Sequence, residues 1–317
     1  MQTILLVMLV LLLAGAAAIA VHDYVTGGNV ILDFRDAWRL RNLELRRLDA
    51  AWAENPHRSG IVVSLTSTPS RLSHLGDTLK SLLLQTRPPA EIRLNIPQFS
   101  KREKTSYVVP DWLPALRSVR VVRCEDYGPA TKFIPTLITE PPDRLVVVVD
   151  DDRIYPSRLL ADLEAAAVAD PGAAIGTTGW IVPADMTDRP TNFSNLFPRP
   201  PAPIMSTKIR HPCPVDILKG VSGYAVRPRF FDLEKLADYS TAPPEAFFVD
   251  DIWLSGKCRA PKIVIPTRRT NFHPRRRAQF YRSTSLGRLD SDKSRNTVML
   301  KYFGPDCWRV GGPHNLR

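Results

Sequence analysis

The stretch Val146-Val147-Val148-Val149-Asp150-Asp151-Asp152 places four β-branched residues directly before three carboxylates. A short, continuous run of valines is typical of a strand that is buried on both faces of a parallel sheet. In open α/β sheets, ligands bind just beyond the carboxyl ends of the strands, and this is where the aspartates stand. The stretch therefore predicts an α/β fold with an acidic site at one edge of its sheet.

The three adjacent carboxylates predict a metal site. They repel one another and cost free energy unless a cation neutralises them. Mn²⁺ and Mg²⁺ prefer oxygen ligands and commonly join one or two carboxylates to substrate phosphates. Because alternate residues of an extended segment point the same way, Asp150 and Asp152 are expected to face one site and Asp151 to face elsewhere. The alternative is a solvated acidic turn without a ligand.

Other segments supply the remaining elements of an α/β domain. Apolar runs predict strands over residues 61–65, 91–96, 119–122, 145–149, 173–177, 221–226 and 262–265. Helical spacing or helix-start signals predict helices over 72–84, 156–169 and 247–257. Strands that alternate with helices predict a sheet that is largely parallel in its first half.

The N-terminus predicts a membrane anchor over residues 1–21. Ile4 to Val21 is an uncharged, apolar run of the length that spans a bilayer. A cleaved signal peptide is the alternative, since Ala18-Ile19-Ala20 fits a small-x-small cleavage site. Only Met-Gln-Thr precedes the run, and this lack of positive charge favours a retained single-pass anchor. Arginines from Arg35 to Arg47 predict that the catalytic domain lies on the cytoplasmic face.

Residues 22–58 are interpreted as a juxtamembrane linker that contains an amphipathic helix. Apolar residues recur there at roughly helical spacing, with arginines between them: Phe34, Trp38, Leu45, Leu48 and Trp52. Such a helix lies on anionic lipid or packs on the domain, and the sequence leaves both alternatives open. The catalytic domain is expected over 59–285 and a C-terminal tail over 286–317.

The bulk composition agrees with a globular, basic protein. The chain has 317 residues and a formal net charge of +11, which suits a polyanionic partner such as a phosphorylated substrate or an anionic membrane. Its four cysteines, which form no C-x-x-C pair, are expected to be mostly buried free thiols: Cys124, Cys213, Cys258 and Cys307.

Over roughly residues 60–280 the chain resembles the GT-A glycosyltransferases, most closely the family 2-like ones. Four segments carry the resemblance in order: Ile61–Arg71, an opening strand and loop; Asp150–Asp152, a D-x-D motif; Lys219–Tyr224, a Gly-containing strand; and Phe248–Leu254, an acidic doublet at a helix start. Two features depart from family 2. The doublet reads Asp-Asp rather than Glu-Asp, and residues 125–132 lack the usual Asn-containing stretch.

The resemblance implies a GT-A fold and transfer of a sugar from a nucleotide-diphosphate donor to a hydroxyl of a glycan or lipid-linked acceptor. It implies a Mn²⁺ or Mg²⁺ cofactor held by Asp150, Asp152 and His273. It implies inversion with Asp251 as the base and Asp250 beside it, the helix dipole favouring the ionised form of Asp251.

The remaining site residues divide between the donor and the sugar or acceptor. Candidate contacts to the donor are Thr66, Arg71, Asp126, Lys132 and Asp151. Candidate contacts to the transferred sugar or the acceptor are Gly220, Ser222, Gly223 and Trp180. A tryptophan stacks well on a sugar ring, although tryptophans more often pack in cores.

Two other functions compete with sugar transfer. A sugar nucleotidyltransferase usually carries a Gly-rich phosphate loop after its first strand, and Thr66 to Arg71 contains no glycine. A non-catalytic, basic, membrane-bound binding protein predicts basic residues interleaved with exposed aromatic residues. The basic residues here are dispersed, so no nucleic-acid partner is expected.

Overall fold

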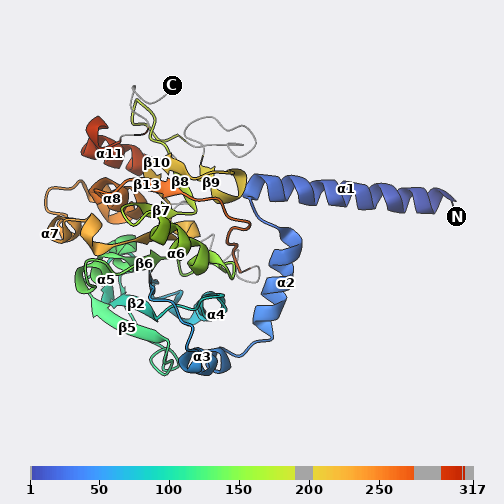
Figure 1. The fold of residues 1–317 in the computed structure, drawn as a ribbon, viewed down its shortest axis with the longest axis horizontal. Helices are drawn as coiled ribbons and strands as arrows, with labels where there is room; N and C mark the ends of the chain where they lie inside the picture. Colours follow the sequence, from blue (N-terminus) through green and yellow to red (C-terminus); the bar gives the residue numbers. More distant parts are fainter. Residues whose placement is uncertain (1, 190–202, 275–293, 309, 311–317) are drawn as a thin grey trace.

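The computed structural model describes residues 2–189, 203–274, 294–308 and 310, and its centre is an eight-stranded sheet (Figure 1). The strand order is β10-β13-β7-β12-β6-β1-β2-β5. The strands are β1 (Val62–Thr66), β2 (Glu91–Pro97), β5 (Val119–Cys124), β6 (Val146–Val148), β7 (Ala174–Gly176), β10 (Cys213–Val215), β12 (Tyr224–Val226) and β13 (Lys262–Val264).

The sheet is mixed, with a parallel half. Strands β6, β1, β2 and β5 run parallel to one another, as β7 and β13 do. Strand β12 pairs antiparallel with both β6 and β7, and β10 pairs antiparallel with β13. The predicted α/β class and mostly parallel sheet are confirmed.

The valine run forms the buried strand that its composition predicts. Val146 and Val148 pack into one apolar cluster, and Val147 and Val149 pack into the cluster on the opposite side of the sheet. These clusters are covered by α4 (Gly76–Leu83), α5 (Ile134–Thr139), α6 (Leu159–Ala169), α7 (Leu233–Ala237) and α8 (Asp250–Lys257).

Two smaller sheets complete the strands of the described part of the chain. One joins β11 (Ile217–Leu218), β8 (Thr178–Trp180) and β9 (Ile204–Met205), and the other joins β3 (Phe99–Ser100) and β4 (Thr105–Ser106). The strand predicted over 221–226 begins late. Residues Gly220–Ser222 form a 3₁₀ turn, and Gly223 has a φ of 88°, a backbone conformation that glycine tolerates.

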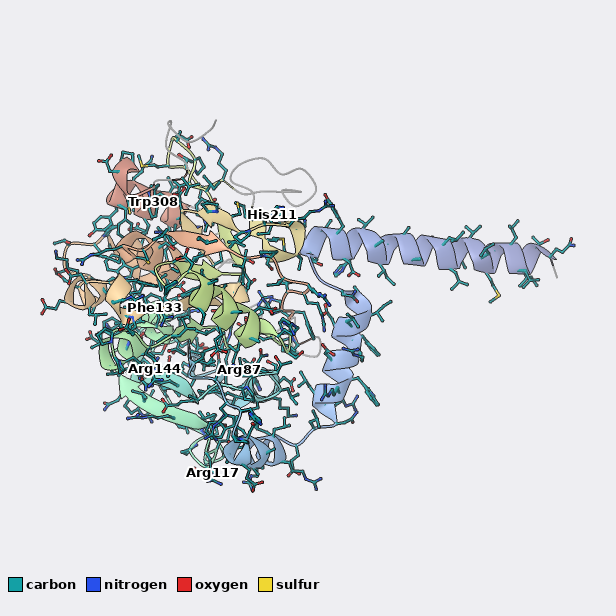
Figure 2. All side chains as sticks on the ribbon, in the orientation of Figure 1. Arg87, Arg117, Phe133, Arg144, His211 and Trp308 are labelled. Atoms are coloured by element: carbon teal, nitrogen blue, oxygen red, sulfur yellow. The ribbon has the colours of Figure 1, made fainter. Side chains whose placement is uncertain are left out.

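Helix α1 (Gln2–Thr26) projects from the domain, and its side chains point outward along its length (Figures 1 and 2). It is long and apolar enough to cross a membrane, a test that a signal sequence also passes. None of its residues is buried. The helix continues beyond residue 21, because His22, Asp23 and Tyr24 remain helical.

The predicted linker helix is two helices, α2 (Val30–Arg41) and α3 (Leu45–Glu54). On α3, Leu45, Leu48 and Trp52 pack against the core, and the Trp52 indole donates to the Pro89 carbonyl at 2.8 Å. The packing alternative therefore holds for α3. On α2, by contrast, Phe34 and Trp38 are exposed.

The C-terminal segment departs from the expected tail over 286–317. Helix α11 (Ser294–Phe303) buries Met299 and Leu300, and Trp308 follows it into the core. Residues 294–308 are therefore part of the domain. The four cysteines are free thiols as predicted, but Cys258 is buried while the others are half-buried.

Candidate active site

A cleft of about 500 Å³ opens at the carboxyl ends of β1 and β6. Most of the predicted site residues line it: Thr66, Arg71, Asp126, Lys132, Asp150, Asp151, Asp152, Asp250, Asp251 and His273. The central strands thus bring residues that are far apart in the sequence to one edge of the sheet, where α/β proteins bind ligands.

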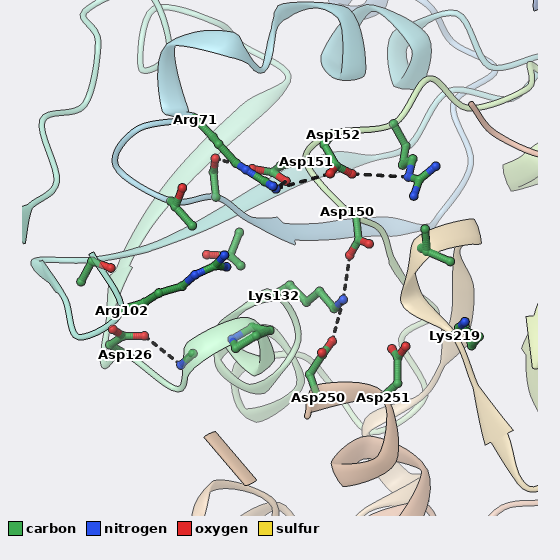
Figure 3. Close-up of a pocket in the computed structure, with 18 of the residues that line it drawn as sticks. Arg71, Arg102, Asp126, Lys132, Asp150, Asp151, Asp152, Lys219, Asp250 and Asp251 are labelled. Carbon is green, nitrogen blue, oxygen red and sulfur yellow. Dashed lines mark hydrogen bonds and ion pairs between the residues drawn. The ribbon is translucent and has the colours of Figure 1, made fainter. Parts of the chain in front are cut away.

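Lys132 lies between the two acidic motifs (Figure 3). Its Nζ is 2.7 Å from Asp150 Oδ1 and 2.6 Å from Asp250 Oδ2. Burial alone would lower the pKa of Lys132, but the charges of Asp150, Asp250 and Asp251 raise it well above its ordinary value. Lys132 is thus the counter-ion that joins the D-x-D to the downstream doublet, and its contact with the donor stays a prediction.

A buried polar network fixes the backbone at Lys132. The Ser64 hydroxyl donates to the Lys132 carbonyl at 2.6 Å and lies 2.6 Å from the Thr136 hydroxyl. The Asn95 amide donates to both hydroxyls, at 3.1 Å and 2.9 Å. Because these three residues come from β1, β2 and α5, the sheet itself holds the lysine in place.

The aspartate triplet divides differently from the prediction. Asp150 turns to Lys132, which outweighs burial and lowers the pKa of Asp150. Asp151 and Asp152 share Arg71, whose Nη1 lies 3.1 Å from Asp151 Oδ1 and 3.4 Å from Asp152 Oδ2. The alternation predicted for an extended strand fails because β6 ends at Val148 and the chain turns at Asp151 and Asp152.

Asp151 is the most enclosed carboxylate of the triplet. The Ser67 hydroxyl donates to its Oδ2 at 2.6 Å, and the Thr78 hydroxyl donates to its backbone carbonyl at 2.8 Å. Burial raises the pKa of Asp151 to about 6, with Arg71 opposing this shift and Asp152 adding to it. These contacts make Asp151 a structural residue of the β6 turn as well as a lining residue of the cleft.

The donor set of the cleft fits a divalent cation that arrives with phosphate ligands. Among the described residues, no three His, Cys, Asp or Glu side chains converge as a ready-made metal site. Mg²⁺-type sites, however, commonly use one or two carboxylates together with substrate phosphates. Asp152 is the carboxylate suited to this role because it lines the cleft, and Arg71 and Arg153, each 3.4 Å from it, are the cations with which the ion competes.

His273 reaches the same place from a distant part of the chain. An antiparallel bridge between Ile154 and Phe272 brings this segment beside the β6 turn. His273 Nδ1 then lies 3.1 Å from the Asp152 carbonyl. His273 therefore contacts Asp152 through its backbone rather than its carboxylate, and its role at a metal stays a prediction.

Asp251 stands at the start of α8 and accepts a hydrogen bond from the Gly220 amide at 2.8 Å. A Cβ at Gly220 would lie 2.6 Å from Lys132 Nζ and 3.2 Å from Asp251 Oδ1, so a larger residue here would displace the lysine side chain. Burial and then repulsion from Asp250 raise the pKa of Asp251 to about 7. This is opposite to the expected effect of the helix dipole, because α8 begins inside the domain.

Three predicted residues make contacts within the fold. Both carboxylate oxygens of Asp126 accept backbone amides, from Lys101 at 2.7 Å and Gly128 at 2.8 Å. The Thr66 hydroxyl donates to the Asn95 carbonyl at 2.7 Å. Trp180 packs into the core cluster instead of presenting a face for a sugar ring.

The Gly-containing turn also differs from the prediction. Lys219 and Val221 line the cleft, whereas Ser222 and Gly223 are not among the described residues that do so. The Ser222 carbonyl accepts a hydrogen bond from the Thr177 hydroxyl at 2.7 Å, and this contact holds the turn in place. Gly220 contributes its backbone amide, as described for Asp251.

Several lining residues escaped the sequence prediction. Arg102, Arg153 and Lys219 add positive charge to the cleft, and Asn296 reaches it from α11. Burial and the nearby charge of Arg71 lower the pKa of Arg102. Arg153 directly follows the D-x-D motif and Lys219 begins the Gly-containing segment, so both were detectable on that ground. Arg102 and Asn296 carry no local signal in the sequence.

No protein-family profile matches the chain, and no curated protein matches its sequence. Among solved structures it is similar to the mannosyltransferase PcManGT from Pyrobaculum calidifontis in complex with GDP-Man and Mn²⁺. The identity is 18% over 80% of this chain and 67% of that chain, with a TM-score of 0.39.

Two further solved structures are similar to the chain. GalNAc-T7 with UDP, GalNAc and Mn²⁺ is 16% identical over 65% of this chain and 41% of that chain, with a TM-score of 0.42. S. aureus TarS 1-349 in complex with UDP is 13% identical over 67% and 59%, with a TM-score of 0.43. The chain thus spans between 41% and 67% of these three chains. Such TM-scores are too low to carry a functional assignment, which rests on the site geometry.

Proposed function

We propose that the chain is a metal-dependent GT-A glycosyltransferase, which moves a sugar from a nucleotide-diphosphate donor to an acceptor hydroxyl. One observation carries this proposal: Asp251 lines the same cleft as the D-x-D aspartates, and Lys132 pairs both with Asp150 of that motif and with Asp250, the neighbour of Asp251. This arrangement supports a leaving-group site on the side of Asp150 to Asp152 and a base at Asp251 in the same cavity.

The donor diphosphate is proposed to occupy the side of the cleft that β6 forms. Asp152, with Asp150 and the neighbouring His273, would hold Mn²⁺ or Mg²⁺, which when bound supplies stabilisation of the negative charge on the leaving diphosphate. Arg102, Arg153 and Lys219 add cationic groups that attract and orient a polyanion.

Asp251 is proposed to act as the general base of an inverting transfer. Its carboxylate removes the proton from the acceptor hydroxyl while that oxygen bonds to the anomeric carbon, and the bond from this carbon to the diphosphate breaks with its electron pair leaving on the diphosphate. A base functions best when its pKa is near the working pH, as the value of about 7 is. The Gly220 amide holds the carboxylate in place.

The acceptor is proposed to be a glycan or lipid-linked hydroxyl, reached from a domain anchored by α1 on the cytoplasmic face. The length and apolar character of α1 support the anchor. The arginines that follow it support the orientation, because positive residues beside a membrane span are retained in the cytoplasm.

The test is a donor screen with matched variants of the full chain in detergent. UDP- and GDP-sugars are incubated with and without Mn²⁺, and nucleoside diphosphate release is measured. Asp152→Ala should lose metal-dependent donor binding and turnover together. Asp251→Asn should keep donor binding but lose transfer. Asp162→Ala, which removes a surface carboxylate paired with Arg158, is the control and should behave as wild type.

Two outcomes would contradict parts of this proposal. Release of pyrophosphate from a nucleoside triphosphate and a sugar phosphate would indicate a nucleotidyltransferase. Turnover by Asp251→Asn close to that of wild type would remove the base assignment and favour retention of configuration.

A further inference from the structure

Helix α2 presents an apolar stripe to the outside of the molecule. Ile31, Phe34 and Trp38 are exposed by 69%, 61% and 63%. At about 100° per residue, the three lie within about 60° of one another on the helix surface. Large exposed apolar side chains that gather in this way mark an interaction surface rather than an ordinary solvated face.

The charges of α2 are divided between its two sides. Arg35, Arg39 and Arg41 are exposed and border the apolar stripe. Both carboxylates of the helix turn to the domain, where Arg269 Nη2 lies 2.9 Å from Asp33 Oδ1 and its Nη1 lies 2.7 Å from Asp36 Oδ2.

Arg35 also contacts Asp36, at 3.1 Å, but its side chain remains 65% exposed. The outward face of α2 therefore combines apolar and cationic side chains, and the acids are held on the inward face.

The position of α2 relative to α1 indicates which surface its exposed apolar stripe would contact. Helix α2 runs crosswise to α1, along the side of the domain from which α1 projects (Figure 1). Residues Gly27 to Asn29 separate the two helices, so α2 begins where α1 ends. On its inner side Leu40 is buried, and its carbonyl accepts from Lys80 of α4 at 2.9 Å. The helix is thus fixed to the domain by the side opposite its stripe.

We propose that α2 lies in the interface of an anionic bilayer. Ile31, Phe34 and Trp38 insert at the boundary between headgroups and acyl chains, and the bordering arginines bind lipid phosphates. An apolar face flanked by basic residues is the composition of helices that lie in the plane of a membrane. Arginines attract anionic lipids, and tryptophan prefers the interface because its ring is both apolar and polar.

This contact fixes the catalytic cleft relative to the lipid surface. Arg269, which holds the inner face of α2, is four residues from His273, which lines the cleft. Arg269 therefore links the membrane-facing helix α2 to the segment that carries His273. A single spanning helix would leave the domain free to rotate, whereas a second contact restricts its orientation.

The test uses the full chain in vesicles of phosphatidylcholine and phosphatidylglycerol with bromine atoms in the upper acyl chains. Bromine quenches tryptophan fluorescence on contact, and α1 contains no tryptophan. Wild type should lose emission in brominated vesicles, and most of this loss should disappear in Trp38→Phe. Trp112→Phe, in which a partly buried core tryptophan is replaced, is the control and should keep the full loss.

A second variant tests the cationic border while α1 keeps the protein in the membrane. In wild type, replacing phosphatidylglycerol by phosphatidylcholine or adding salt should reduce the bromine-dependent loss, because lipid charge is removed or screened. The triple variant Arg35→Gln, Arg39→Gln, Arg41→Gln should show a smaller loss that no longer depends on lipid charge.

Three results would overturn the proposal. Equal bromine-dependent loss in wild type and Trp38→Phe would show that Trp38 is not in lipid. Quenching of Trp38 by aqueous iodide in intact vesicles would show that the stripe faces water. Protection from both quenchers would show that protein covers it. Because the readout is fluorescence, failure here leaves the proposed sugar transfer untouched.

Discussion

Gly220 lies in close contact with Lys132, which pairs with both acidic motifs, and with Asp251. An alanine there would push its Cβ against the Lys132 ammonium, which Asp150 and Asp250 hold from both sides. Gly220→Ala should therefore displace the lysine and loosen Asp251. We expect a loss of stability of about 1–3 kcal/mol, typical of overpacking, and a fall in kcat of about tenfold or more.

The measurements are thermal melting and steady-state transfer. Gly76→Ala is the matched control, since a Cβ at this helical position meets nothing within 4 Å. A Gly220→Ala enzyme with wild-type kcat would show that Lys132 and Asp251 need not be held so closely.

The pH dependence of transfer follows from Asp251. In the proposed transfer the Asp251 carboxyl must be ionised to accept a proton, so kcat/KM should rise with pH and level off above about pH 7. Below that value the rate should fall about tenfold per pH unit, as for a single required ionisation. A rate profile without an acid limb near neutrality would contradict the assignment.

The same pKa has a consequence for stability. The folded-state pKa of Asp251 is raised from 3.8 to about 7, so the native state keeps a proton that the unfolded chain has released between these values. The free energy of unfolding should therefore fall as pH rises through this window. Asp251→Asn removes this effect, so its Tm should exceed that of wild type by several degrees at about pH 8 and by less at about pH 5.

At the residue scale, the sequence predicted which acids line the cleft better than how they pair. The D-x-D and the Asp250-Asp251 doublet were recognisable because each adjoins a predicted strand end or helix start. The sharing of Arg71 by Asp151 and Asp152 was not predictable, because it depends on where β6 gives way to a turn.

At the scale of elements, the contact between α2 and the Arg269 segment is a partly buried three-charge cluster. Arg269→Ala would leave Asp33 and Asp36 without their shared cation and should cost about 2–3 kcal/mol, more than an exposed pair and less than a fully buried one. The KM for the donor should also rise, because Arg269 leads into the segment that carries His273.

Chemical denaturation and donor titration check this prediction. Arg158→Ala breaks an exposed pair with Asp162 on α6 and should change stability by less than about 1 kcal/mol. Equal effects of the two substitutions would show that α2 is held only loosely.

The division of this segment into α2 and α3 is a feature that the sequence pattern did not predict. A single amphipathic pattern from Phe34 to Trp52 did not reveal the break at residues 42–44, so one helix was expected. A helix face packs on the domain only where it meets a partner such as Pro89, whose carbonyl accepts a hydrogen bond from the Trp52 indole. Pro89 lies far from Trp52 in the sequence. Local spacing contains no information about such a partner.

At the scale of the whole molecule, the C-terminal segment closes the core. Trp308 packs against Phe303 edge-on, and its indole donates to the Leu300 carbonyl at 3.2 Å. Trp308→Ala should destabilise the domain by about 3–5 kcal/mol, as expected for a buried aromatic residue. Val168→Ala at a surface position should change stability by less than about 0.5 kcal/mol, and denaturant unfolding distinguishes the two.

The sequence pattern predicts the first half of the sheet but not the packing of this C-terminal segment. The strands of the parallel half follow one another with recognisable apolar runs, and their sheet was predicted correctly. Residues 294–308 instead pack on α8 and on the turn before it, which the sequence does not indicate. Long-range packing of this kind follows from the assembled sheet rather than from any pattern in the segment itself.

The lysine between the two acidic motifs has a consequence for the order in which ligands add. With Asp150 bound to Lys132 and Asp152 flanked by two arginines, a free divalent ion finds few available oxygens and must compete with the protein's own cations. The ion should therefore bind weakly alone and tightly as its nucleotide complex, which brings phosphate oxygens with it. Calorimetric titration with Mn²⁺, before and after nucleoside diphosphate is added, should give an ordered rather than random scheme.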